Sequence, residues 1–479
     1  MPENRQGTRP NLEYYRKAAK SLLKAAQSGD SAARARMERF FPGAEMPFAL
    51  HHAQLTIARE QGFASWPRFR NFLVESALDF AGLVAKFIDA ALDNRPQAEE
   101  MLSQHPEIAG AGFFVALVLG DTARVEGAIA ESPGIATAKG GPRNWAPLSY
   151  VCFSRFAAAR SPRAGDLTAT ARVLLAHGAD PNGFHEDEHW PDNPFPCLYG
   201  ASGLNNNVAL TSLLLDAGAS ADDDESLYHS SEHADLACFR VLLERATTDR
   251  ATKVLNHMLD KDDLTGLRLL LAAGADPNRV NKNGETSLHW AVWRGRSVAI
   301  IETLLDAGVE VDVRRKKDGR TAYALAVQSG QTATAKLLAS RGANTDVPAL
   351  DAFIGKLAAA ELPDRLVSHT EQLPDEYSTL LPDLASSHCT SGVRALLAAG
   401  IDVNTMGHDG CTALHWACWK GYADLVKLLL DHGASLDIED SAYHATPAGW
   451  LDHGRGNSIE RGDYELTERI LREAGAKIE

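Results

Sequence analysis

One short motif recurs along most of this chain, and the repetition limits the folds that the chain can adopt. The motif is a pair of leucines, a short spacer and then Gly-Ala or a near variant; its glycine recurs every 34 residues at Gly274, Gly308 and Gly342. A second signature, TSLHWA at 286–291 and TALHWA at 412–417, precedes two of the leucine pairs. Self-similarity at a period of this length is typical of a solenoid. Further copies of the leucine motif end at Gly178, Gly218, Gly400, Gly433 and Gly475.

Each copy of the motif has the features of two helices joined by a turn. Thr286 follows a glycine and is a suitable residue to cap the amino end of a helix. Leu304 and Leu305 fit the buried face of a second helix, and the glycine after them supplies the left-handed residue that ends it. Because one such unit cannot bury its apolar face alone, neighbouring units must stack. The sequence therefore predicts an all-α solenoid of helix-turn-helix units.

These motifs resemble the ankyrin repeat, whose unit is a turn and two antiparallel helices with a T-P-L-H-x-A signature. The segment AQLTIAREQGFASWPRFRNF resembles a lead-in common to bacterial ankyrin-repeat proteins, and no activity accompanies that resemblance. Together, the two resemblances imply an ankyrin-repeat solenoid with a helical N-terminal cap. We expect four parts: a helical cap at 1–79, a first block of repeats at 80–345, degenerate repeats or a bend at 346–381, and a second block with a C-terminal cap at 382–479. Within the cap, residues 11–79 predict about three helices, in LEYYRKAAKSLLKAAQSG, ALHHAQLTIAREQGF and SWPRFRNFLVESALDF.

The second block looks like a duplicate of the first, because a shift of 126 residues superposes one signature on the other. By the same resemblance, His289 and His415 are structural histidines that bond between adjacent turns. Trp290 and Trp416 stand where the repeat usually keeps a core leucine, so we expect both of them to pack in the core. Between the blocks, we favour degenerate repeats over a bend.

The composition excludes several classes of function. The chain has 479 residues, with 48 lysines and arginines against 63 aspartates and glutamates, which gives a net charge of −15. A general nucleic-acid binder needs a positive surface to displace counterions. No apolar run approaches the roughly 20 residues that span a bilayer, and the amino end lacks the apolar core of a signal peptide. We expect a soluble, cytoplasmic, monomeric protein with no nucleic-acid partner, no membrane partner and no cofactor.

The best match to an enzyme motif is His185–His189, which has the H-E-x-x-H spacing of zinc proteases. That spacing works on a helix, where both histidines share one face. Here five proline and glycine residues crowd the motif, so a stable helix is not expected. We predict an extended polar loop, with no metal ligand and no catalytic residue; the crowding residues are Pro181, Gly183, Pro191, Pro194 and Pro196.

Two charged runs have ordinary explanations. The acidic run Asp222–Glu225 precedes a predicted helix, where carboxylates favour the positive helix end. The basic run Arg314–Arg320 lies on a predicted hairpin. We favour a hydrated turn for this run over a contact with an anionic partner.

The resemblance implies that a partner binds at the hairpin tips and at the exposed ends of the inner helices. These positions follow the signature leucine by five and six residues. Tryptophan and arginine are enriched at binding hot spots, although each tryptophan could instead fill a gap between poorly matched repeats. The projected partner-binding residues are Trp293, Arg294, Trp419, Lys420, Glu232, His233, Asp260, Lys261, Gln328 and Phe153.

Two functions are compatible with the predicted solenoid and its projected binding residues. The first is a non-enzymatic scaffold that binds a protein partner of unknown identity through the concave groove and the hairpin tips, as fold analogy suggests. The alternative is a small-molecule-binding protein or enzyme, with a site in the groove near the degenerate repeats at 222–262. That site would use His233, His257, Asp260 and the tryptophans. An enclosed pocket with a strongly shifted pKa would favour the alternative.

Overall fold

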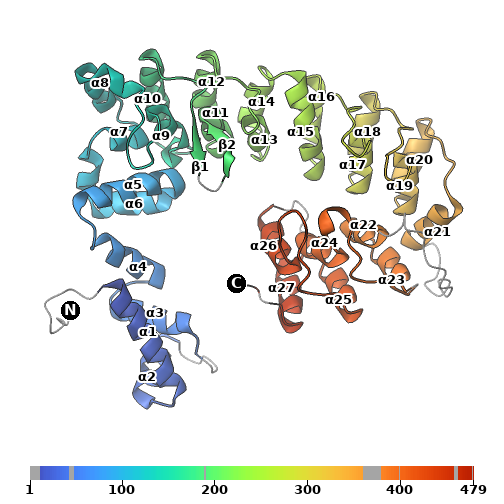
Figure 1. The fold of residues 1–479 in the computed structure, drawn as a ribbon, viewed down its shortest axis with the longest axis horizontal. Helices are drawn as coiled ribbons and strands as arrows, with labels where there is room; N and C mark the ends of the chain where they lie inside the picture. The colour runs from blue at the N-terminus through green and yellow to red at the C-terminus, as the bar shows by residue number, and fades with distance from the viewer. Residues whose placement is uncertain are drawn as a thin grey trace. The chain divides into compact units, whose positions relative to one another are not determined.

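The fold is described from a computed structural model, which describes residues 11–41, 48–187, 190–359, 379–398, 400–457, 462–476 and 478. The chain divides into two compact units, Met1–Asp180 and Pro181–Glu479. Both units are built from short helices, with a single pair of strands among the described residues (Figure 1). The expected all-α solenoid of stacked helix-turn-helix units is confirmed.

The first unit begins with four helices that share one core, which contains Tyr15, Leu22, Met37 and Phe69. The sequence predicted about three helices in this region. The helix that it missed is α2, which begins after Asp30 because the Asp30 carboxylate accepts the backbone N–H groups of two residues in its first turn. The four helices are α1 (Leu12–Gln27), α2 (Ser31–Glu38), α3 (Leu50–Glu60) and α4 (Trp66–Glu75).

Helix pairs then follow one another through the rest of the first unit. Helix α5 packs against α6 and α7, and α7 packs against α8 and α9. Tyr150 lies fully buried on α9 and donates its hydroxyl to the carbonyl of Gly140. These helices are α5 (Phe80–Asp93), α6 (Arg95–Gln104), α7 (Phe113–Leu119), α8 (Thr122–Glu131), α9 (Pro147–Phe153) and α10 (Ala164–Ala176), with short 3₁₀ turns at Pro106–Gly110, Pro133–Ala136 and Arg155–Ala157.

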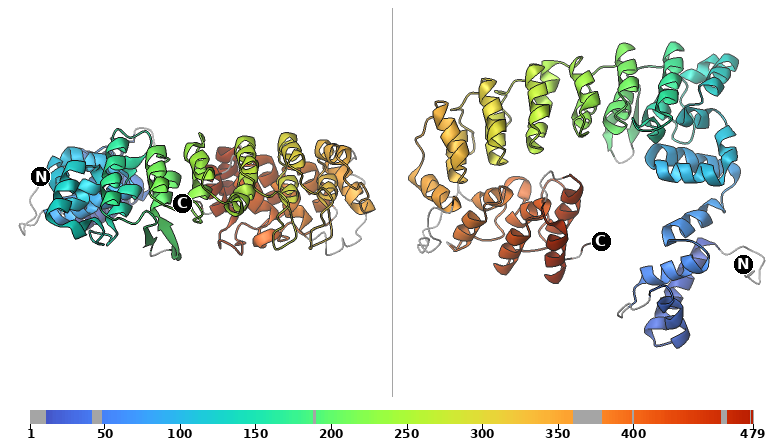
Figure 2. Two further views of the ribbon diagram at one scale, coloured as in Figure 1. Left: turned by 90° about the horizontal axis from the view of Figure 1, so that it is seen from above. Right: turned by 180° about the vertical axis from the view of Figure 1, so that it is seen from behind.

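The second unit contains a row of inner and outer helices, in which each inner helix packs against the inner helices before and after it. Figure 2 shows this row from two further directions. Its elements are α11 (Cys197–Tyr199), a π-helical turn (Gly200–Leu204), α12 (Val208–Asp216), α13 (Ser226–Ser230), α14 (Ala237–Leu243), α15 (Thr248–Asp260), α16 (Leu264–Ala272), α17 (Ser287–Trp293), α18 (Val298–Asp306), α19 (Ala322–Gln328) and α20 (Thr332–Ser340).

The later helices of the second unit form a further stack. Helix α24 packs against α22, α25 and α26, and α25 packs against α27. The sequence predicts degenerate repeats or a bend at 346–381, and residues 360–378 of this stretch lie outside the described residues. Helix α21, which lies in the described part of the stretch, packs against both α19 and α23. These helices are α21 (Ala349–Ala358), α22 (Leu380–Ser386), α23 (Thr390–Ala398), α24 (Ala413–Lys420), α25 (Ala423–Asp431), α26 (Pro447–Asn457) and α27 (Tyr464–Glu473), with a 3₁₀ turn at His408–Gly410.

The signature histidines hold the turns together, as the resemblance implied. The Nδ1 atom of His289 accepts the backbone N–H of Thr286 at 3.2 Å, which leaves the ring proton on Nε2. That Nε2 donates to the carbonyl of Arg320 in the next hairpin, at 3.4 Å. His415 repeats the arrangement with Thr412 and with the carbonyl of Ala445. Burial lowers the pKa of both histidines, which fits a neutral structural role.

The described part of the H-E-x-x-H segment, at 185–187, is a strand and not a helix. Strand β1 (Phe184–Asp187) pairs antiparallel with β2 (Trp190–Pro196), and His185 is opposite Phe195. Glu188 and His189 lie outside the described residues. The helical arrangement that a zinc protease needs is therefore not formed at His185.

The two leucines of a repeat pair have different surroundings, which gives a test of the stacking. Leu304 on α18 is fully buried, whereas Leu305 is half-buried. We expect Leu304→Ala to lower the free energy of unfolding by about 2–5 kcal/mol, because it leaves a cavity in the core. The matched Leu305→Ala should cost clearly less, as measured by urea denaturation followed by circular dichroism. Equal losses from the two variants would contradict the assigned faces.

Candidate functional site

The inner helices α13, α15 and α17 bring three of the projected residue pairs into one line. Each pair lies at the carboxyl end of its helix or just beyond it, and consecutive inner helices pack against each other. Residues at the same position of successive repeats therefore become neighbours. We call this line the concave row; it consists of Glu232, His233, Asp260, Lys261, Trp293 and Arg294.

Glu232 connects the α13 segment to α15. Its Oε2 atom lies 3.0 Å from Nδ1 of His229, and its Oε1 atom lies 3.7 Å from Nε2 of His257 and 3.9 Å from Nζ of Lys261. The other ring nitrogen of His229 lies 3.1 Å from Glu225. Burial lowers the pKa of His229, but the two carboxylates outweigh it and raise the pKa to about 9. His229 is therefore a cation at neutral pH.

Glu225, Tyr228, His229, Glu232 and His257 form one cluster. Within this cluster, His257 has the opposite protonation preference to His229. Its ring stacks on that of Tyr228, with the centroids 3.9 Å apart. Burial, helped by the charge of Lys261, lowers the pKa of His257 to about 4. Burial and the charge of Glu232 raise the pKa of Tyr228 to about 12. The cluster thus contains one charged and one neutral histidine at neutral pH.

Asp260 connects α15 to α17. It accepts the indole N–H of Trp290 at 2.9 Å and lies 2.9 Å from Nε of Arg294. The guanidinium carbon of Arg294 lies 4.5 Å from the ring centroid of Trp293, 5.0 Å from that of Trp290 and 5.1 Å from that of Trp416. Trp416 is buried, as expected, whereas the expectation was wrong for Trp290, which is only half-buried and donates its indole N–H to Asp260.

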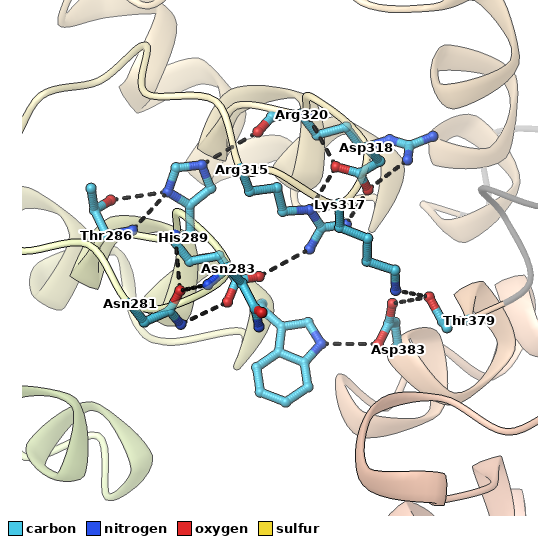
Figure 3. Close-up of polar contacts among 12 residues, drawn as sticks. Asn281, Asn283, Thr286, His289, Arg315, Lys317, Asp318, Arg320, Thr379 and Asp383 are labelled. Carbon is cyan, nitrogen blue, oxygen red and sulfur yellow. Dashed lines mark hydrogen bonds and ion pairs between the residues drawn. The ribbon is translucent and has the colours of Figure 1, made fainter.

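Trp293 contacts the second block rather than solvent alone. It packs against the core of the second block and meets Trp416 edge to face, with the ring centroids 5.8 Å apart. Its indole N–H donates to Asp383 on α22 at 3.1 Å. Figure 3 shows Lys317 extending toward Thr379 and Asp383, and its Nζ donates to the Thr379 hydroxyl at 2.5 Å.

Other projected residues are used inside the protein. Lys420, Gln328 and Phe153 are buried, so their expected place on the surface was wrong. Gln328 donates to Asp351 at 2.8 Å. Sequence position alone did not reveal this burial, because it depends on what the next helix contributes. Their contact with a partner stays a prediction.

Trp419 and His233 also have partners within the chain. The Trp419 ring lies edge to face with Trp450, with the centroids 5.5 Å apart, and its carbonyl accepts the Tyr464 hydroxyl. His233 contacts the carbonyl of Gly203 through Nε2, at 2.7 Å. The gap-filling alternative for the tryptophans therefore agrees with the packing of Trp419 and Trp293.

The basic run at 314–320 is a turn, as expected, but two of its arginines form an internal ion-pair network. Arg315 and Arg320 are buried, and both pair with Asp318 (Figure 3). Arg320 also forms two hydrogen bonds of 2.9 Å with Asp351. Although burial raises the pKa of Asp318, the two guanidinium groups outweigh it and hold that pKa well below its usual range. Arg314 and Lys316 stay exposed.

The acidic run at 222–225 acts locally, although not as a simple solvated cap. The Asp223 carboxylate accepts the backbone N–H groups of Glu225 and Ser226. Asp222 accepts from Thr247 in the next repeat, and Arg250 pairs with Asp224 at 2.6 Å. The run therefore joins two repeats.

Sequence reasoning missed several members of the cluster. Tyr228, His229 and Glu225 fall in the degenerate signature ESLYHSSEHAD, and that departure from the repeat was their only signal. Asp383 had no signal, because it lies at the start of the second block and outside the repeat signature.

Within the described ranges, no group of three His, Cys, Asp or Glu residues is arranged to hold a metal ion. No described helix combines the length and apolar character needed to cross a bilayer.

Comparison with known proteins identifies the repeat. Residues 255–349 and 361–440 match the family described as ankyrin repeats in three copies. The chain is 29% identical over 185 residues to the B-cell lymphoma 3 protein homolog of Mus musculus, over 38% of this chain and 35% of that protein. It is 28% identical over 213 residues to the ankyrin repeat and KH domain-containing protein mask-1 of Caenorhabditis elegans, over 43% of this chain and 8% of that protein.

A third relative is a putative ankyrin repeat-containing protein of Treponema pallidum. The identity is 31% over 145 residues, which are 30% of this chain and 40% of that protein. The matched stretches thus span less than half the length of each of these three relatives. The similarity concerns the repeats and not the whole of any relative.

The charged state of His229 predicts a specific dependence of stability on pH. A pKa near 9, raised above the ordinary value of 6.5, adds stability that is complete below pH 6.5 and is lost as the pH rises toward 9. We expect His229→Gln to weaken the fall in urea midpoint between pH 6.5 and 9. His257→Gln is the matched control, because a pKa near 4 leaves that histidine neutral throughout this range. Identical slopes for wild type and His229→Gln would rule out the assigned ion pairs.

The Arg320–Asp351 pair predicts a large effect on stability. Removing one member of a buried ion pair leaves the other charge without full compensation. We expect Asp351→Ala to lower the free energy of unfolding by about 3 kcal/mol, measured by urea denaturation. Asp249→Ala is the control, since it breaks an exposed pair with Arg279 and should have a far smaller effect. If both variants cost the same, the network does not stabilise the fold as described.

Proposed function

The chain is an ankyrin-repeat protein, and we propose that it is a non-enzymatic scaffold that binds a protein partner through the concave groove and the hairpin tips. Ankyrin repeats generally mediate protein–protein interactions, and this inference from the fold is one of analogy. The observation that carries the proposal is the concave row, in which aromatic and charged side chains from three successive inner helices gather. Such a mixture is typical of binding hot spots.

Exposed tyrosines extend this row and are the residues that we assign to the partner. Tyr228 is 38% exposed and Tyr443 is 78% exposed. The two are close enough for electrostatic repulsion from Tyr443 to contribute to the raised pKa of Tyr228. A tyrosine offers a large contact area at a small entropic cost. We therefore propose that Tyr228, Tyr443, Glu232 and Lys261 contact the partner directly.

The class of partner follows from charge. With a net charge of −15, the chain is poorly suited to a polyanion such as nucleic acid. We propose a protein partner, and a monomer in the cytoplasm as the state that binds it.

A small-molecule or catalytic site near 222–262 is the second candidate. The observation in its favour is the pair His229 and His257, whose pKa values shift in opposite directions within one cluster. Such pairs are found at functional sites, and also in structural networks. Two cavities of the protein lie elsewhere, one lined by Phe63 and Met101 and one by Asp121 and Arg163. Because fold analogy favours protein binding, the scaffold is the function that we prefer.

Affinity capture from a native lysate tests the scaffold. We expect the double variant Tyr228→Ala/Tyr443→Ala to lose partners that the wild type retains, because both rings are exposed. The control is Val208→Ala/Val298→Ala, which changes two exposed side chains at the starts of the outer helices α12 and α18. Recovery of the same partners by all three proteins, quantified by mass spectrometry, would remove the assigned face from consideration.

A further inference from the structure

The two stacks of repeats in the second unit meet at a small polar and aromatic junction. On one side are Trp293 and Arg294 at the end of α17; on the other are Asp383 on α22 and Trp416 on α24. The contacts are the 3.1 Å hydrogen bond from Trp293 to Asp383, the edge-to-face pair of Trp293 and Trp416, and the stacking of Arg294 on Trp416. Lys317 adds its hydrogen bond to Thr379.

Each side of the junction has its own core. Helix α17 packs against α15, α18 and α19, and α24 packs against α22, α25 and α26. Helices α17 and α24 are not a closely packed pair, so they meet through long side chains. A junction of this kind can be broken by changing side-chain rotamers, whereas separating neighbouring repeats would expose their apolar core.

The duplicated block shows that the junction is specific to the first copy. Trp419 and Lys420 occupy the positions of Trp293 and Arg294 after the shift of 126 residues. Trp419 nevertheless packs within its own block, against Trp450 and His453. The first copy has arginine where the second has lysine, and a planar guanidinium is the better group for stacking on several rings.

We propose that this junction is a latch, which holds the second block against the carboxyl end of α17. When the latch opens, the side chains of Trp293, Arg294 and Trp416 become available together. Their use by a partner rests on the proposed scaffold function. The opening itself is a property of the chain and can be measured without any partner.

The test compares a latch variant with a matched ion-pair variant. Arg294→Gln/Asp383→Ala removes the stacked cation and the acceptor of the Trp293 indole N–H. Arg279→Gln/Asp249→Ala makes the same two substitutions away from the junction, at an exposed Arg–Asp pair whose nitrogen and oxygen atoms lie 2.7 Å apart. Small-angle X-ray scattering gives the radius of gyration, and hydroxyl-radical footprinting with mass spectrometry gives the oxidation rate of Trp293 and Trp416.

We expect the latch variant to have a larger radius of gyration and several-fold faster oxidation of Trp293 and Trp416. The control variant should match the wild type in both readouts. An unchanged radius and unchanged oxidation rates in a folded latch variant would overturn the proposal. If circular dichroism shows that this variant loses helix, Asp383→Leu alone, which has a similar side-chain size but no acceptor for the Trp293 indole N–H, is used with the same criteria. Partner capture is not part of either readout, so failure of the latch and failure of the scaffold are distinguishable.

Discussion

Stacking between neighbours is the constraint on which the rest of this structure depends. An inner helix of seven residues and an outer helix of nine cannot bury their apolar faces as an isolated pair. Leu288 and Leu304 are fully buried in helices that pack against the repeats before and after them. This dependence places equivalent residues of successive repeats side by side. Any polar side chain at the concave end of an inner helix is therefore within reach of the next one.

Four carboxylates join separate elements: three of them connect successive repeats, and Asp383 connects the two stacks. Glu232 joins the α13 segment to α15, Asp260 joins α15 to α17, Asp383 joins α17 to α22, and Asp351 joins the α19 hairpin to α21. Each accepts hydrogen bonds or pairs with cations from a neighbouring element. Several side chains that the repeat pattern assigns to a partner thus have a structural role in this chain. Residues such as Tyr228 and Tyr443, which keep a large exposed area, are better candidates for contact with a partner.

The sequence predicted the local features of the fold well because they are encoded locally. The capping of α17 by Thr286 and the bonding of His289 between turns depend on residues within one repeat and its neighbour. Helix α2 was missed because its alanines and arginines lack an apolar period, although Asp30 was present to cap it. The burial of Gln328 was missed because its partner, Asp351, lies in a helix without the repeat signature. The stacking of Arg294 on Trp416 depends on how the chain turns between the blocks, which no local pattern specifies.

The contact between Arg294 and Trp416 tests whether the Trp293–Arg294 end of the concave row is engaged within the chain. A double-mutant cycle with Arg294→Gln and Trp416→Leu, measured by urea denaturation, isolates the energy of this one contact. We expect a coupling energy of about 0.5–2 kcal/mol, the range of a partly desolvated cation–π pair. Additive effects of the two substitutions, within about 0.3–0.5 kcal/mol, would show that the two residues do not interact in solution.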